Sequence, residues 1–372
     1  MLTAKRICAL LLALVMVFGL VACGGEAPKD NPANDPAPQD PVDPAPADPV
    51  DPNPITPAPA DPAPIIPASP LTMSDEEVLK AINYDTVTTR GMCGDNLYWA
   101  YKDGVLTITG TGEMYTYGRG KDPSPWREQE LDPIRVVIGE GATSIGPCAF
   151  YQIETLEAVS VPQSVTNLGF GAFEKCSALK SFTMPNAKEV GTKVFWKCTS
   201  LESVTIGGTL DRIADNFCND CPNLKTVTLS DSITTIGASA FHTCPKLSSI
   251  NMPKNLQVIQ SNAFAGCTSL TKVNLPQSTT QLWMGAFTGC TSLSEVTVPG
   301  IVRIAEYVFQ DCTALKEITL PATVTECYGL GNSGIEKVYV PASVSLETIS
   351  GLVLSAEAYF AEVHPEITLI LQ

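Results

Sequence analysis

Seven cysteines recur at nearly constant spacing in this 372-residue chain, at positions 176, 198, 221, 244, 267, 290 and 312. Thiols that meet on adjacent layers of a fold could form disulfides, or could bind a metal ion as thiolates. An odd number of equally spaced thiols cannot all pair, and no histidine or second cysteine pair completes a zinc site. We therefore interpret the seven as reduced core residues, because cysteine packs as a small apolar side chain. The spacing leaves open whether Cys93, Cys148 or Cys218 form disulfides.

Cys218 and Cys221 have the spacing of a redox motif, but that motif works at the start of a helix in a βαβ unit. Here we interpret the spacing as one extra residue between Phe217 and Cys221. The only 2 histidines, His242 and His364, lie far apart in the chain, and no nucleophile, base and orienting group occur together. We therefore predict no catalytic residues, no metal and no cofactor, in a protein that is not an enzyme.

The seven cysteines belong to a repeated unit that is marked by phenylalanine. Phenylalanine recurs at 150, 173, 195, 217, 241, 264, 287 and 309, with intervals of 22 to 24 residues. Each unit reads Phe-x-x-Cys-x-x-Leu-x-x-Val-x-Leu-Pro, as in residues 264–276. A period between about 20 and 29 residues with this leucine pattern predicts a leucine-rich repeat solenoid, in which stacked coils share one core.

Each repeat is expected to form one short parallel strand. Val273 and Leu275 lie two residues apart and so face one side, whereas Lys272 and Asn274 face the other. The fold class is therefore an α/β solenoid of about 23-residue coils, whose returning segments are short helices or turns. The predicted strands cover residues 134–138, 158–161, 181–184, 203–206, 226–229, 249–252, 272–275, 295–298, 317–320 and 337–340.

Both ends of the solenoid need caps over the exposed core. Residues 96–101 and 105–109 alternate in polarity around an Asp-Gly turn signal, which predicts an N-terminal β-hairpin cap. Before it, Ser74 and Glu77 have the spacing of a capping box and predict the start of a helix. The predicted organisation is a helix and hairpin cap over 71–133, a solenoid over 134–344 and a C-terminal cap over 345–372.

The amino end predicts export and lipid attachment. Two basic residues precede an apolar run over residues 7–22, as in a secretory signal, and this run is short for a membrane span. Leu20-Val21-Ala22-Cys23 resembles the bacterial lipobox, in which the cysteine is lipidated and becomes the mature amino terminus. We therefore predict a lipoprotein signal peptide over 1–22 and a lipid on Cys23.

The segment after the lipid site predicts a spacer. Residues 26–70 contain 16 of the 30 prolines and carry a net charge of −7. Such a segment favours extended polyproline II structure and cannot build a core. We interpret residues 23–70 as the lipidated cysteine and a disordered stalk that lifts the folded part through a cell wall.

Together with the segment before it, the repeat resembles the BspA-like class of bacterial leucine-rich repeat proteins over residues 91 to about 344. The preceding segment contains Gly91-Met92-Cys93-Gly94-Asp95-Asn96-Leu97-Tyr98-Trp99, a Gly104–Met114 stretch and Pro125-Trp126, and these are similar to the leader of that family. The resemblance implies a secreted or surface protein that takes part in adhesion and in contact with hosts or other bacteria. It brings no catalytic residues.

Net charge narrows the class of partner. Lys+Arg 23 against Asp+Glu 39 gives −16, which argues against nucleic acid because phosphate binding needs a basic face. The expected role is a binding module on the extracellular face of a cell membrane, anchored through its N-terminal lipid only, in a Gram-positive bacterium. Its partner would be a host or bacterial surface protein or glycan. The alternative is a structural or assembly component of the envelope with no foreign ligand.

Two surfaces are candidates for binding. The strand face presents a column of small polar residues that includes Thr205, Thr228, Asn251, Asn274 and Thr297, which would suit a broad contact or a glycan. The same column is also what a well-solvated sheet surface contains. Elsewhere Trp283, Met284 and Tyr307 interrupt positions that are small or polar in neighbouring coils, and large apolar groups on adjacent coils are typical of binding hot spots.

Overall fold

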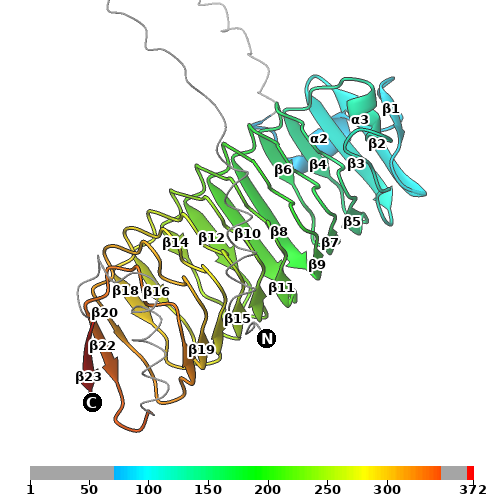
Figure 1. Cartoon of the computed structure of the whole chain (residues 1–372). Helices are drawn as coiled ribbons and strands as arrows, with labels where there is room; N and C mark the ends of the chain where they lie inside the picture. The colour runs from blue at the N-terminus through cyan, green and yellow to red at the C-terminus, as the bar shows by residue number, and fades with distance from the viewer. Residues whose placement is uncertain (1–70, 345–366) are drawn as a thin grey trace, which may run out of the picture. The chain divides into compact units, whose positions relative to one another are not determined.

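The computed structural model describes residues 71–344 and 367–372, which form a parallel β-solenoid of about nine turns of about 23 residues each (Figure 1). The predicted signal peptide, lipidated cysteine and stalk lie outside the described residues, as does most of the predicted C-terminal cap. Within the described part of the chain, no helix is long and apolar enough to cross a bilayer.

A first row of strands contains one strand per coil, and all ten predicted strands are confirmed. Thr205 pairs with Thr228 in a parallel ladder, and neighbouring pairs repeat this register. Five of the strands end one or two residues earlier than predicted, each shortly before a proline, which cannot donate a ladder hydrogen bond. The row consists of β4 (Arg135–Ile138), β6 (Ala158–Ser160), β8 (Ser181–Ala187), β10 (Ser203–Gly208), β12 (Thr226–Leu229), β14 (Ser249–Ile250), β16 (Lys272–Asn274), β18 (Glu295–Thr297), β20 (Glu317–Thr319) and β22 (Lys337–Val340).

A second row of two-residue strands, which the sequence did not predict, follows the first in each coil (Figure 1). These strands also pair in parallel with those of the next coil, except between the third and the fourth strand of the row. The second residue of nearly every pair is buried, so this row closes another side of the core. It consists of β5 (Ser144–Ile145), β7 (Asn167–Leu168), β9 (Glu189–Val190), β11 (Arg212–Ile213), β13 (Thr235–Ile236), β15 (Val258–Ile259), β17 (Gln281–Leu282), β19 (Arg303–Ile304) and β21 (Glu326–Cys327).

The returning part of each coil is built from turns. The helices of the described residues, α2 (Asp75–Ala81) and α3 (Pro125–Glu128), both precede the repeats. Tight turns need residues with positive φ, and nearly every coil supplies two such positions. The first left-handed column contains Cys148, Gly171, Lys193, Asn216, Ser239, Asn262, Gly285 and Tyr307, and the second contains Gln152, Lys175, Lys197, Asp220, Thr243, Gly266, Gly289, Asp311 and Asn332.

The core is a column of phenylalanine rings beside a column of thiols. The rings of Phe241, Phe264 and Phe287 are fully buried and stack with centroids 5.4 and 5.3 Å apart. Each of the seven spaced cysteines is buried and unpaired. Each Sγ donates a hydrogen bond to a backbone carbonyl oxygen of the preceding coil, at 3.0 to 3.2 Å. The interpretation of these cysteines as core residues is confirmed.

The interpretation that one extra residue lies between Phe217 and Cys221 is wrong. In regular coils the phenylalanine N–H donates to the carbonyl oxygen of the residue just before the phenylalanine of the next coil. Phe195 N instead donates to Phe217 O at 2.8 Å, and Cys218 N donates to Ala240 O at 2.7 Å. Phe217 therefore occupies the small-residue register and Cys218 the phenylalanine register, and the coil keeps its usual length.

This exchange changes how the rings meet. Phe217 meets Phe195 and Phe241 at interplanar angles of 86° and 84°, whereas the rings of regular neighbouring coils stack within 16° of parallel. Cys244 Sγ accordingly donates to Cys218 O, at 3.1 Å, in place of a phenylalanine carbonyl.

The predicted N-terminal hairpin and helix are both present. β2 (Asn96–Lys102) and β3 (Val105–Thr111) form the antiparallel hairpin, and β3 pairs in parallel with β4, so the hairpin continues the first row. β1 (Arg90–Met92) pairs with β2 at the sheet edge, and Trp99 is buried in the core of the repeats. The capping box of Ser74 and Glu77 begins α2. At the other end, β23 (Thr368–Leu371) pairs in parallel with β22.

Candidate binding surfaces

The predicted strand-face column lies on the solvent side of the first row. Thr205 and Thr228 are register partners, as are Asn274 and Thr297. Thr205 is half-buried and the other three are exposed. The Oγ1 of Thr297 donates to Asn274 Oδ1 at 3.2 Å, so neighbouring members of the column interact. The column presents short polar groups without an apolar centre.

The side chain of Asn251, the remaining member of the column, hydrogen-bonds to the backbone of the preceding coil. Its Oδ1 accepts a hydrogen bond from Leu229 N at 2.7 Å, and its Nδ2 donates to Leu229 O at 2.8 Å. The side-chain amide thus replaces the backbone ladder where β14 ends. Its polar atoms are used within the protein.

Trp283, Met284 and Tyr307 lie on another side of the coils, just after the second row. Trp283 and Met284 follow β17, and Tyr307 follows the adjacent β19. Their exposed fractions are 40%, 48% and 49%, which is high for large apolar side chains. The indole Nε1 of Trp283 donates to Gln281 Oε1 at 3.1 Å. The structure therefore brings the three predicted residues to one region, away from the strand-face column.

The sequence reasoning missed Tyr328, which is 42% exposed and follows β21 on the next coil. Tyr328 and Trp283 share one register, since each N–H donates at 2.9 Å to the last residue of the second-row strand one coil earlier. Other coils have glycine, alanine or glutamine at this register. Tyr328 directly follows Cys327, which the sequence identifies as a core position, and this adjacency could have revealed it. We call Trp283, Met284, Tyr307 and Tyr328 the aromatic patch.

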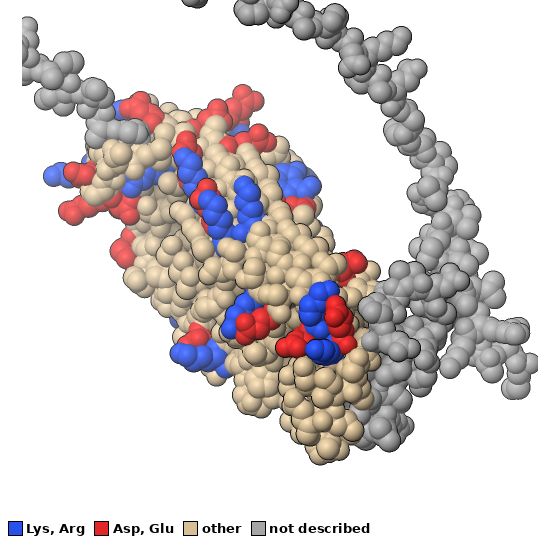
Figure 2. Space-filling model, turned by 90° about the vertical axis from the view of Figure 1, so that its left-hand side faces the viewer, with Lys and Arg blue, Asp and Glu red and all other residues tan. Residues whose placement is uncertain are grey.

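Six ion pairs of the described residues join adjacent coils of the solenoid. The ammonium group of Lys225 lies 2.9 Å from Glu202, and that of Lys272 lies 2.6 Å from Glu295. Figure 2 shows basic and acidic side chains side by side within a broad uncharged surface. Exposed pairs of this kind contribute little stability, but they leave little net charge on the coils that carry them.

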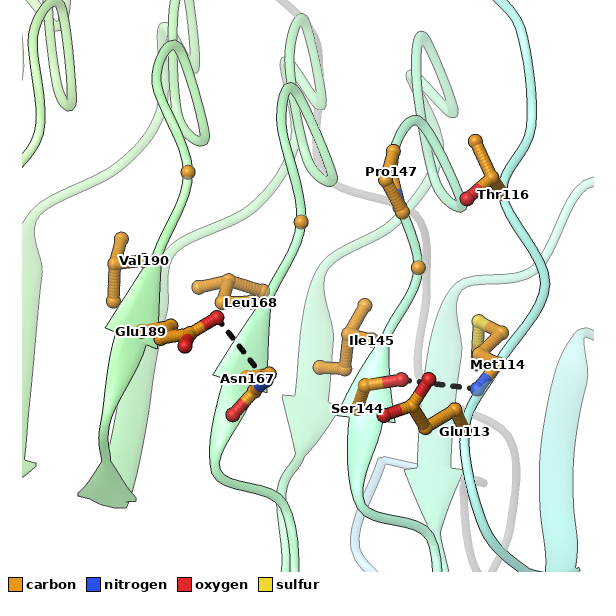
Figure 3. A pocket seen from close by; sticks show the side chains of 13 residues that line it. Glu113, Met114, Thr116, Ser144, Ile145, Pro147, Asn167, Leu168, Glu189 and Val190 are labelled. Carbon is orange, nitrogen blue, oxygen red and sulfur yellow. Dashed lines mark hydrogen bonds between the residues drawn. The ribbon is translucent and has the colours of Figure 1, made fainter.

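A hollow of about 360 Å³ lies where β5, β7 and β9 approach the segment before them (Figure 3). Its lining includes glycines of three successive coils, among them Gly169. A Cβ on Gly169 would lie 2.3 Å from Pro147 N, so close packing of the coils requires glycine and leaves the surface concave. The polar groups engage one another, as where Asn167 Nδ2 donates to Glu189 Oε2 at 3.3 Å.

The cysteines have little chemical reactivity in this setting. Burial raises the pKa of Cys93, Cys267 and Cys312 to about 12, far from the range in which a thiolate forms readily. Cys93, Cys148 and Cys218 are buried and free. Among residues 71–344 and 367–372, no group of three or more His, Cys, Asp or Glu could hold a metal ion.

The repeats match the sequence pattern of the family described as BspA type leucine rich repeat region. Six copies of the pattern cover residues 132–247 and 234–352. No curated protein matches this chain in sequence.

Solved leucine-rich repeat structures are similar to this chain. One is a protein from Bacteroides ovatus, with 20% identity, a TM-score of 0.52 and coverage of 75% of this chain and 76% of that chain. Another is the T. pallidum leucine-rich repeat protein, with 22% identity, a TM-score of 0.41 and coverage of 63% and 89%. The likeness to the Bacteroides protein is a likeness of fold.

Proposed function

Because this chain belongs to the BspA-type leucine-rich repeat family, we propose that it is a lipid-anchored binding module on the outer face of a bacterial membrane, where it adheres to host proteins, glycans or other cells. Solenoids of this type are typically binding or scaffold modules. Stacked coils present long surfaces whose side chains can vary while the core repeat stays constant.

The aromatic patch carries the proposal. Its side chains come from three adjacent coils, and they are among the most exposed large apolar side chains in the described residues. Clustered exposed aromatic residues are typical of interaction surfaces, because they bury a large area while losing few rotamers. Scattered single apolar residues would need no such explanation.

The backbone conformation of Tyr307 also supports a role of the patch in binding. Its φ is 60°, in the left-handed region that costs a residue with a β-carbon about 1 kcal/mol or more. Several other coils place Gly, Asn or Ser at this register, as at Asn216 and Asn262. A half-exposed tyrosine at a position that disfavours it points to a role outside folding.

The surroundings of the patch indicate the chemistry of the partner. Glu306 is exposed between patch residues, and Arg303 pairs with Glu326 at 3.0 Å beside it. An apolar centre with a polar rim is the usual composition of protein interfaces, and aromatic faces also stack on sugars. The patch therefore supports a protein or glycan partner, and the strand-face column would widen the contact.

Binding of the full-length protein to host matrix proteins, host cells and bacterial cells tests the proposal. Trp283→Ala should weaken binding by about 2 kcal/mol if Trp283 is an anchor. Tyr115→Ala is the matched control, because Tyr115 is 44% exposed but belongs to the segment before the repeats. Failure of the wild-type protein to bind any of these surfaces would leave an envelope component without a foreign ligand as the function.

A further inference from the structure

Two lysines without an ion pair in the described part of the chain lie over the ring of Trp196 in the N-terminal half of the solenoid. The ammonium groups of Lys193 and Lys197 lie 4.8 and 5.0 Å from the centroid of the Trp196 ring. Neither lysine has an ion-pair partner among the described residues. The aromatic face holds both charges in place without neutralising them.

The positive charge continues onto the preceding coil. Lys175 Nζ lies 5.5 Å from the centroid of the Tyr151 ring and donates to Tyr151 Oη at 3.3 Å. Arg119 stacks over Phe170 at 4.6 Å and pairs with the buried carboxylate of Glu174. Asp220 Oδ2 accepts a hydrogen bond from Trp196 Nε1 at 3.3 Å, so two carboxylates lie among the four cations. We call Arg119, Lys175, Lys193 and Lys197 the basic ridge.

The ridge breaks the charge pattern of the solenoid. Lys175 and Lys197 occupy the same register on adjacent coils, as shown by the hydrogen bond from Lys175 N to Trp196 O at 2.8 Å. Several other lysines of the solenoid pair with a carboxylate on an adjacent coil, as Lys225 pairs with Glu202. Like charges at one register repel each other and destabilise neighbouring strands or turns.

The backbone of the ridge is also unfavourable for lysine. Lys175, Lys193 and Lys197 have φ values of 63°, 59° and 63°, in the left-handed region. Asn, Asp and Gly adopt this region more easily, and they occupy these two columns in several other coils. Three lysines therefore stand where both electrostatics and backbone conformation disfavour them, which points to a role in binding.

We propose that the basic ridge binds an anionic glycan through its sulfate or carboxylate groups. Coils lie about 4.8 Å apart, so a ridge over two neighbouring coils and the loop beside them is about 10 Å long and accommodates two or three anionic groups of a sugar chain. The net charge of −16 would repel a long polyanion, such as a nucleic acid, where it extends beyond the ridge. Salt screens charges that lie more than about 10 Å away, so a short anionic segment interacts mainly with the cations of the ridge. The ridge lies on different coils from the aromatic patch and can bind independently of it.

Binding of the full-length protein to heparin, hyaluronan and single-stranded DNA at two salt concentrations tests this site. The double variant Lys193→Asn, Lys197→Asn removes two positive charges and places asparagine, which adopts positive φ easily, at both positions. The matched control, Lys180→Asn with Lys225→Asn, removes two charges that are paired with Glu157 and Glu202. We expect the ridge variant to bind the glycan about tenfold more weakly, and the slope of log affinity against log salt concentration to fall by about two ion pairs. The affinity of the control should change less than about twofold.

Thermal unfolding of the ridge variant should occur at the wild-type temperature or higher, which separates loss of binding from loss of folding. Binding to heparin alone would support the site and show that it requires sulfate groups. Binding to both glycans would support the site and show that carboxylate groups are sufficient for binding. Equal losses in the two double variants, tighter binding to DNA than to either glycan, or no glycan binding by the wild type would overturn the proposal. Trp283→Ala should leave glycan binding at the ridge unchanged.

Discussion

The thiol of Cys312 donates a hydrogen bond to the carbonyl oxygen of Phe287, one coil earlier, at 3.2 Å. The same oxygen accepts the N–H of Cys290 at 3.1 Å, so the thiol occupies its remaining acceptor site. A cysteine at this bend combines apolar volume with a weak donor, which alanine lacks. The repetition of this contact explains why one thiol recurs in each coil.

Alkaline pH should destabilise the protein through these thiols. Burial raises the pKa of Cys312 from 9.0 to about 12, so the unfolded state loses the proton first. The contribution to stability is fully present below about pH 9 and is lost as the pH rises toward 12, with a limiting slope of about 1.4 kcal/mol per pH unit for each such group. Urea unfolding with reductant present, at about pH 8 and about pH 10, measures this.

Cys312→Ala is the comparison for that slope. The variant should be less stable than wild type by about 1 to 2 kcal/mol near pH 8, through lost packing and the lost hydrogen bond. Its stability should then fall less steeply between the two pH values. Identical slopes for variant and wild type would exclude Cys312 as a source of the pH dependence.

The exchanged residues Phe217 and Cys218 should be strongly coupled. Phe217→Ala removes a buried ring and should cost about 3 to 4 kcal/mol, and Cys218→Phe alone should overpack the core. The double variant restores the Ala-Phe order of regular coils and should recover at least about 2 kcal/mol relative to the sum of the single changes. A double-mutant cycle by urea unfolding measures this coupling. Additive single effects would contradict the register that we describe.

Tyr307→Asn should separate binding from stability. Asparagine suits the φ of 60° at this position, so stability should stay constant or rise by up to about 1 kcal/mol. Adhesion to the partner surface should fall, because an exposed aromatic ring of the patch is lost. Thermal unfolding and cell binding measure the two effects. A lower melting temperature with unchanged adhesion would make Tyr307 a packing residue.

The two candidate surfaces can be told apart by paired variants. If the strand face takes part in recognition, Thr228→Arg should weaken binding, because a long charged side chain would protrude from the polar column where Thr228 is exposed. Trp283→Ala should weaken it through the aromatic patch. Normal affinity for Trp283→Ala, together with lost affinity for Thr228→Arg, would assign recognition to the strand face alone. Partner-binding assays on the same cell panel provide the measurement.

Cys23→Ala should release the protein from the membrane. Cys23 follows small residues at the end of the apolar run, which is where a lipoprotein cysteine is expected. The variant should move from the membrane fraction to the soluble or secreted fraction of the producing cell. Quantitative blotting of fractions checks this, with Cys267→Ala as a cysteine change that should not alter fractionation. Wild-type membrane retention by Cys23→Ala would end the lipoprotein interpretation.

The sequence by itself determined the period, the first strand row, the buried cysteines, the hairpin and the capping box. Each of these depends on neighbours within a few residues, or on one apolar pattern that repeats along the chain. Val273 and Leu275 show this, because their spacing alone places both in the core. The exposed positions of Trp283, Met284 and Tyr307 could also be predicted, since they interrupt that pattern.

Only the tertiary structure decided how one coil lies against the next. The second strand row, the exchange of Phe217 with Cys218 and the bridge from Asn251 to Leu229 all depend on contacts between residues about one coil apart. The same is true of the lysines that share a register at Lys175 and Lys197. Local periodicity cannot fix these features, because a side chain's partner is set by the backbone register of the adjacent coil, and a shift of one residue there changes which groups meet.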